Sequence, residues 1–279
     1  MENWLATIST LMACMSTDRS NTALLAVVPD LAQRFSAAVI GVWARQLSMH
    51  SSIMAIGAGE PSGHEPDKFR ERAAALEAEF RTALSMVSNL RWRAQMTAGP
   101  TSQYVANEAR AADLLIAAVE PGERFSSSSE IEVTDLLMRG GRPILMAPAG
   151  AAGLKLARTL VCWKDSREAR RAVADALPIL KASQAVDVVE LVSDHEIEPA
   201  RSRLADVGDW LAGHGVEASC VATPLSGAES AHLAAIANDL EADWIVAGAF
   251  GHSRLREWAF GGVTRDLLVR AGRCTLVSH

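Results

Sequence analysis

The feature that most constrains the fold of this sequence is a repeat within the chain. Ala112-Asp-Leu-Leu-Ile-Ala117 matches Ala242-Asp-Trp-Ile-Val-Ala247. Asp135-Leu-Leu-Met-Arg-Gly-Gly-Arg-Pro-Ile-Leu-Met146 matches Asp266-Leu-Leu-Val-Arg-Ala-Gly-Arg-Cys-Thr-Leu-Val277 at an offset of 131 residues (266 − 135). The beginnings match too, Thr10-Leu-Met-Ala-Cys14 with Thr159-Leu-Val-Cys-Trp163. Because single cores rarely grow much beyond ~250 residues, we expect two domains, 1–150 and 151–279, each holding one copy.

Each copy alternates short apolar runs with amphipathic segments. We expect strands at 8–14, 37–42, 92–97, 114–119, 144–147, 159–163, 186–192, 217–223, 244–247 and 274–277. We expect helices at 22–35, 67–90, 101–111, 130–139, 166–181, 200–214, 228–240 and 264–270. Strands that are apolar on both faces and alternate with helices indicate a parallel sheet covered on both sides. The sequence therefore predicts an α/β fold with two tandem five-stranded units.

Composition excludes several classes of function. A formal net charge of −6 and a pI near 5.7 argue against a nucleic-acid partner, since binding phosphate backbones needs clustered Lys and Arg. No apolar run approaches the ~20 residues of a membrane helix, and the apolar start lacks the positive flank of a signal peptide. The four cysteines share no metal-like spacing, which is typical of buried thiols in a reducing compartment. We expect a cytoplasmic protein without a membrane partner.

A glycine-bearing loop in the second copy is suited to holding a phosphate. The apolar strand 244–247 stops at Gly248 and Gly251; Gly261 and Gly262 follow, and a short amphipathic helix then begins near Val263-Thr264. Glycines let the backbone come close and turn its N–H groups one way, and a helix N-terminus adds positive potential. This order of strand, glycine loop and helix predicts an anion site after the fourth strand of the second copy.

The pattern Gly248-x2-Gly251-x9-Gly261, with the wording Gly-His-Ser-Arg-Leu-Arg-Glu257, resembles the nucleotide loop of tandem, two-domain universal stress proteins. The resemblance is strong in residues 155–279 and faint before them. It implies a Rossmann-like fold of the adenine nucleotide alpha hydrolase type, in which the fifth strands, 144–147 and 274–277, pair across an internal pseudo-dimer. It also implies that ATP, or ADP or AMP, binds the second copy with Mg²⁺ bridging phosphates. One departure is Gly262, which stands where the ATP-binding pattern has Ser or Thr.

The first strand of the second copy ends in Trp163-Lys164-Asp165, at the edge where open α/β sheets bind ligands. From the residues alone, Asp165 or Ser166 is more simply an N-cap of the next helix. The resemblance implies instead that Asp165 contacts the base and that Val192, at the end of the second strand, lies against it. The resemblance places Ala247, Gly248, Gly251, Gly261, Gly262 and Val263 around the ribose and phosphates. From their positions in and after the loop, His252 and Thr264 could add donors near a phosphate. For Thr264, helix capping is an alternative to binding phosphate, and for His252 a plain surface loop is an alternative.

The first copy lacks these features, so we expect it to be a degenerate scaffold with an empty site. Ala118 replaces the glycine, Ser16-Thr17 stands where Asp165-Ser166 does, and Pro121 removes an N–H donor. Glu120 and Glu123 would repel a phosphate.

No catalytic motif is visible in the sequence, so we expect a nucleotide-dependent stress-response regulator with an unidentified protein partner, at most a weak ATPase. Two alternatives stay open. The first is a slow ATPase or phosphotransferase, for which only His252 or Asp165 could orient water or an acceptor. The second is an interaction protein without nucleotide, in which Gly262 marks a decayed site. Homodimers of the chain are compatible with either.

Overall fold

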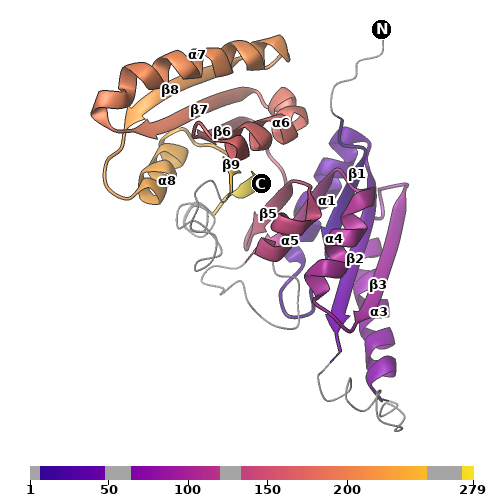
Figure 1. The fold of residues 1–279 in the computed structure, drawn as a ribbon. Coiled ribbons are helices and arrows are strands. Elements are labelled where there is room, and N and C mark those ends of the chain that lie inside the picture. The colour runs from indigo at the N-terminus through magenta and orange to yellow at the C-terminus, as the bar shows by residue number, and fades with distance from the viewer. Residues whose placement is uncertain (1–6, 48–63, 120–132, 250–271) are drawn as a thin grey trace. The chain divides into compact units, whose positions relative to one another are not determined.

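The computed structural model describes residues 7–47, 64–119, 133–249 and 272–279. The chain divides into two compact units, one built mainly from Ile8–Ala118 and α5, the other from Pro143–His279. We call these the N-terminal and C-terminal units (Figure 1). In the described residues, no helix is long and apolar enough to cross a membrane.

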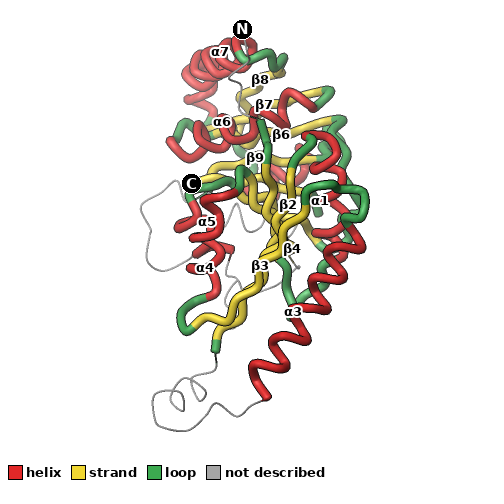
Figure 2. The backbone as a smooth tube through the Cα atoms, turned by 90° about the vertical axis from the view of Figure 1, so that its right-hand side faces the viewer, coloured by secondary structure: helices red, strands yellow, loops and turns green. Residues whose placement is uncertain are grey.

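The strands of the N-terminal unit are all parallel and lie in the order β3-β2-β1-β4. Their bounds are β1 Thr10–Cys14, β2 Ala38–Gln46, β3 Leu90–Thr97 and β4 Leu114–Val119. The helices are α1 Thr22–Phe35, α3 His64–Ala83, α4 Thr101–Glu108 with a 3-10 turn at Ala109–Ala111, and α5 Val133–Gly140. Figure 2 shows α1 and α3 on one face of this sheet and α4 and α5 on the other, as two-sided burial of the strands predicts.

The C-terminal unit has the strand order β5-β10-β9-β6-β7-β8. The strands are β5 Ile144–Pro148, β6 Arg158–Trp163, β7 Ala185–Val192, β8 Ala218–Pro224, β9 Trp244–Gly248 and β10 Cys274–Ser278. The helices are α6 Arg167–Ala182, α7 Ile197–Gly213 and α8 Glu229–Asp239, with a 3-10 turn at Asp194–Glu196. On the α8 side, Leu233 and Ala237 pack with Leu160, Val189 and Ile245 in one buried cluster.

The predicted pairing of the two fifth strands is confirmed. Strand β5 pairs antiparallel with β10, with Leu145 opposite Leu276 and Ile144 opposite Val277, and all four side chains are buried. All other strand pairs within the C-terminal unit are parallel. Strand β5, which the repeat assigns to the first copy, therefore completes the sheet of the C-terminal unit.

Among the helices, the one predicted over 67–90 differs most from the structure; differences elsewhere are smaller, as at α7, which begins at Ile197 where 200 was expected. The apolar stripe led us to expect a helix over 67–90, but α3 runs from His64 to Ala83. Leu76, Phe80 and Leu84 of the stripe are buried, and the chain turns after Ala83, with Val87 N–H donating to the Leu84 carbonyl at 2.9 Å. Apolar spacing alone could not place this end, because Leu84 is a core residue on either side of the boundary.

The repeated Ala-Asp dipeptide ties the first and fourth strands of each copy together. The Asp113 carboxylate accepts hydrogen bonds from the backbone N–H groups of Ser9 (2.8 Å) and Thr10 (2.9 Å). Asp243 accepts from Ala157 and Arg158, both at 3.0 Å. Each aspartate thus satisfies two N–H groups at the start of a central strand, where the sheet ladder does not yet reach them.

We predict that Asp243→Ala lowers the free energy of unfolding by about 1–3 kcal/mol, because two backbone donors lose a charged acceptor. Urea unfolding followed by circular dichroism measures it. The control is Asp239→Ala, an exposed carboxylate at the end of α8, which should change stability by less than about 0.5 kcal/mol. Equal effects of the two substitutions would show that the hydrogen bonds to Asp243 do not stabilise the fold.

Candidate functional site

The strand order of the C-terminal unit reverses between β6 and β9, which makes this the place where open α/β sheets bind ligands. Three of the predicted site residues lie at the carboxyl ends of adjacent strands there: Trp163 on β6, Val192 on β7 and Ala247 on β9. The register joins them, since Trp163 pairs with Glu190 and Cys162 with Ala247. All three are buried. The structure therefore brings together the described part of the predicted site.

Helix α6 begins directly after β6 and rests on Gly248. A Cβ built on Gly248 would lie 2.5 Å from the Ala169 backbone nitrogen and 2.6 Å from the Glu168 carbonyl carbon. Only a glycine lets the first turn of α6 come so close to the end of β9. The contact places a helix N-terminus, which attracts anions, beside the switch point.

The sequence left either Asp165 or Ser166 as the cap of this helix, and the structure identifies Ser166. The Ser166 hydroxyl accepts from the Ala169 N–H at 3.3 Å. Asp165 forms an ion pair with Arg170 at 2.6 Å, and more than half of its side chain is exposed. Lys164 is exposed, and its carbonyl accepts from the Ser166 N–H at 2.6 Å. Asp165 is therefore on the surface of the switch point with no capping role.

A buried ion pair beside Trp163 was not anticipated from the sequence. Glu190, 3% exposed, accepts two hydrogen bonds from Arg203 Nε (both 3.0 Å) and one from Nη2 (2.8 Å). The hydrogen bonds that the Arg203 guanidinium donates to Glu190 raise its pKa, and the charges of Glu190, Glu196 and Asp165 add to this. The sequence signal is a glutamate inside the apolar run of β7, two residues before Val192. The pair joins α7 to the sheet below the switch point.

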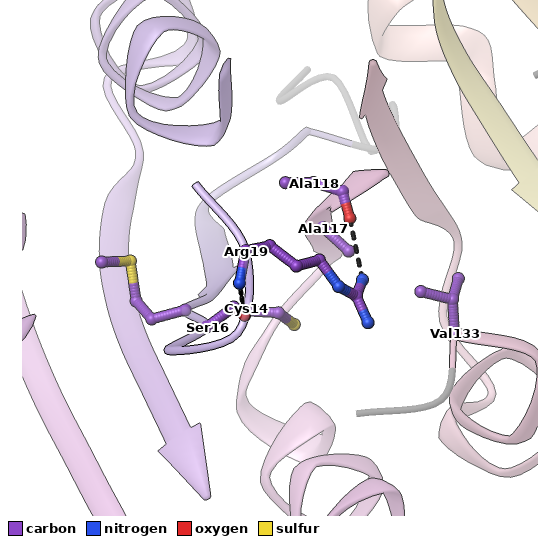
Figure 3. A pocket seen from close by; sticks show the side chains of 7 residues that line it. Cys14, Ser16, Arg19, Ala117, Ala118 and Val133 are labelled. Atoms are coloured by element: carbon purple, nitrogen blue, oxygen red, sulfur yellow. Dashed lines mark hydrogen bonds between the residues drawn. The ribbon is translucent and has the colours of Figure 1, made fainter. Parts of the chain in front are cut away.

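The equivalent place in the N-terminal unit is built differently. Helix α1 starts at Thr22, six residues after Ser16, whereas α6 starts at Arg167, two residues after Asp165. The first turn of α6 has no counterpart there, and the Arg19 guanidinium reaches across to the Ala118 carbonyl at 3.2 Å (Figure 3). A pocket remains around this side chain, lined by Cys14, Met15, Ser16, Arg19, Ala117, Ala118 and Val133.

Six of the predicted site residues lie outside the described residues: Gly251, His252, Gly261, Gly262, Val263 and Thr264. The helix expected at 264–270 lies there as well. Their part in the site stays a prediction. Among the residues that the structure does describe, no three His, Cys, Asp or Glu side chains are grouped to hold a metal ion.

All four cysteines are free thiols, and their environment makes them poor nucleophiles. Burial raises the pKa of Cys14, Cys162 and Cys274 to about 12 in each case. Burial also raises the pKa of Cys220. A thiol with a raised pKa stays protonated at neutral pH, so Cys162, although next to Trp163, does not supply a thiolate to the site.

We predict that Cys14, Cys162 and Cys274 of the folded protein do not react with Ellman's reagent at pH 8. A pKa near 12 leaves roughly one thiol in ten thousand ionised at that pH. Absorbance at pH 8 should show at most a slow reaction of Cys220, and four thiols should react after unfolding in guanidinium chloride. Any reactive thiol in folded Cys220→Ser would contradict the prediction.

We predict that Gly248→Ala lowers the free energy of unfolding by about 1–3 kcal/mol, because the added Cβ collides with the backbone of α6. The control is Gly213→Ala at the end of α7, where an added Cβ meets nothing within 4 Å. Thermal unfolding of both variants checks the difference. A Gly248→Ala protein as stable as the parent would show that α6 does not depend on this contact.

Comparison with known proteins identifies the fold of the chain but assigns the chain to no sequence family. No family model and no curated protein sequence matches the chain. A universal stress protein from Archaeoglobus fulgidus DSM 4304 matches in structure with a TM-score of 0.76 at 13% identity, covering 96% of this chain and 97% of its own. A protein of unknown function from Pseudomonas aeruginosa PAO1 matches with a TM-score of 0.61 at 14% identity, covering 97% and 92%. A universal stress protein solved in complex with cAMP covers 45% of this chain and 99% of its own, at 22% identity and a TM-score of 0.38. The first match shows that the chain has, over nearly its whole length, the tandem α/β fold of a universal stress protein.

Proposed function

We propose that the C-terminal unit binds an adenine nucleotide, ATP or else ADP or AMP, at the carboxyl ends of β6, β7 and β9. The observation that carries this proposal is the contact of α6 with Gly248, which sets a helix N-terminus at the topological switch point. Fixed N–H groups and the helix dipole favour an anionic ligand at such a place. The buried side chains of Val192 and Ala247 give the same edge an apolar surface that suits a flat base.

The difference between the two units supports a single site in each chain. In the described residues of the N-terminal unit, α1 begins further from its strand than α6 does, and Arg19 reaches the Ala118 carbonyl at the switch point. We therefore propose that this unit is a scaffold and that nucleotide binds with a stoichiometry of one per chain.

In the proposed complex, the exposed Asp165 carboxylate accepts a hydrogen bond from the amino group of the base, and Lys164 beside it contributes positive charge. Gly251, His252, Gly261, Gly262, Val263 and Thr264 line the ribose and phosphates, mainly through backbone N–H groups. Mg²⁺ reaches the site bound to the phosphates, because this cation commonly keeps waters and binds through phosphate oxygens.

We propose that the output is regulatory, a nucleotide-dependent change in the binding of a protein partner in the cytoplasm. The three thiols with pKa values of about 12 are protonated at neutral pH and supply no thiolate nucleophile. Four free cysteines also fit a reducing compartment.

We predict that the purified protein releases an adenine nucleotide on denaturation, detected by mass spectrometry, and that it binds Mg-ATP in calorimetric titration. Asp165→Ala should weaken binding about tenfold or more, because a charged acceptor for the amino group is lost. The matched control is Glu198→Ala, which also removes an exposed carboxylate paired with an arginine, Arg201. If the parent binds none of ATP, ADP and AMP, the proposal fails; if both variants weaken equally, Asp165 is not at the base.

A further inference from the structure

Two buried polar atoms on either side of Gly248 have no hydrogen-bond partner among the described residues. They are the indole Nε1 of Trp163, 8% exposed, and the hydroxyl oxygen of Ser278, 2% exposed. Ser278 ends β10 and pairs with Gly248, while Trp163 ends β6 and follows Cys162, which pairs with Ala247. The three strands β6, β9 and β10 thus end in a row of Trp163, Gly248 and Ser278.

The register also places both side chains on one face of the sheet. Paired residues of parallel strands project to the same side, so Trp163 and Ser278 share the face toward which a Cβ of Gly248 would point. That Cβ would meet Glu168 and Ala169 in the first turn of α6. The two side chains therefore flank the helix N-terminus on which the proposed site depends.

Both groups can donate a hydrogen bond, and leaving a buried donor unsatisfied is costly. Most buried polar atoms in folded proteins are paired, and each one that is not calls for an explanation, such as a bound water, ion or ligand. Two such donors beside a helix N-terminus favour one kind of partner, a group with acceptor atoms. The ring nitrogens of a base and the oxygens of a ribose or phosphate are acceptors of this kind.

We infer that Trp163 and Ser278 are binding residues of the nucleotide site, each donating a hydrogen bond to an acceptor atom of the ligand. This inference rests on the proposed function and adds Ser278, which no sequence motif identified. Because both atoms lie below the surface, the ligand group that reaches them enters at the strand ends beside the first turn of α6.

The experiment removes each donor and measures stability and binding separately. Trp163→Phe and Ser278→Ala are compared with Trp43→Phe and Thr134→Val, which delete an indole N–H and a hydroxyl that are equally buried and lack a described partner in the N-terminal unit. Without nucleotide, none of the four substitutions removes a hydrogen bond between described residues, so Ser278→Ala should change the melting temperature as Thr134→Val does, and Trp163→Phe, which also loses buried volume, as Trp43→Phe does. In Mg-ATP titration, Trp163→Phe and Ser278→Ala should each weaken binding about tenfold, and the two controls should bind like the parent.

The outcomes separate the two proposals. A parent that binds no adenine nucleotide ends the proposed function and this inference with it. A parent that binds ATP, with Trp163→Phe and Ser278→Ala binding equally well, overturns the inference alone. A fall in melting temperature for these two variants without nucleotide, absent in the controls, also overturns it, because the donors would then have partners inside the protein.

Discussion

The fold depends on the hydrogen bonds by which one aspartate in each copy holds the first strand beside the fourth. The side chain of Asp113 accepts hydrogen bonds from two backbone N–H groups at the start of β1, and that of Asp243 accepts two at the start of β6. Each aspartate also donates its own backbone N–H to the first strand of its copy, Asp113 to the Thr10 carbonyl and Asp243 to the Arg158 carbonyl, both at 2.9 Å. Because this contact makes the first and fourth strands neighbours, it fixes where the strand order reverses. The repeated Ala-Asp dipeptide thus has a structural role at the amino ends of the strands. By making the first and fourth strands neighbours, it also sets the position of the switch point at their carboxyl ends.

The two copies form the same contacts at the amino ends of their strands and different contacts at the carboxyl ends. At the amino ends of the strands both use the same Ala-Asp dipeptide in the same way. At the carboxyl ends Gly248 admits the first turn of α6, while Ala118 faces Arg19 and a helix that starts further along the chain. A duplicated unit keeps its fold as long as the amino-end contacts persist, so the carboxyl end of one copy is free to lose a binding function without loss of structure.

Sequence periodicity predicted most elements because the strands are buried on both faces and the helices carry one apolar stripe. The bounds of α1 and β4 agree with the expectation, and the β5–β10 pairing followed from the resemblance. The end of α3 did not follow, since Leu84 is buried either way. The ion pair of Glu190 with Arg203 and the row of Trp163, Gly248 and Ser278 arise from register and from helix placement. Neither is encoded in local spacing, which is why sequence reasoning named Trp163 and Gly248 but not Ser278.

Several groups at the carboxyl ends of the strands in the C-terminal unit lower the stability of the folded protein. Gly248 is entropically unfavourable at the end of a strand although its contact with α6 requires it, and the unpaired indole and hydroxyl beside it add desolvation costs that apolar side chains would avoid. The neighbouring Glu190 is different, because three hydrogen bonds from Arg203 compensate its burial. Among the described residues of this unit, the row around Gly248 holds two of the three buried side-chain atoms without a hydrogen-bond partner, the third being Asp187 Oδ2 on β7, while the charged pair next to the row is fully satisfied. Two unpaired donors at the carboxyl ends of nearby strands suit a surface that gains its missing interactions from a ligand.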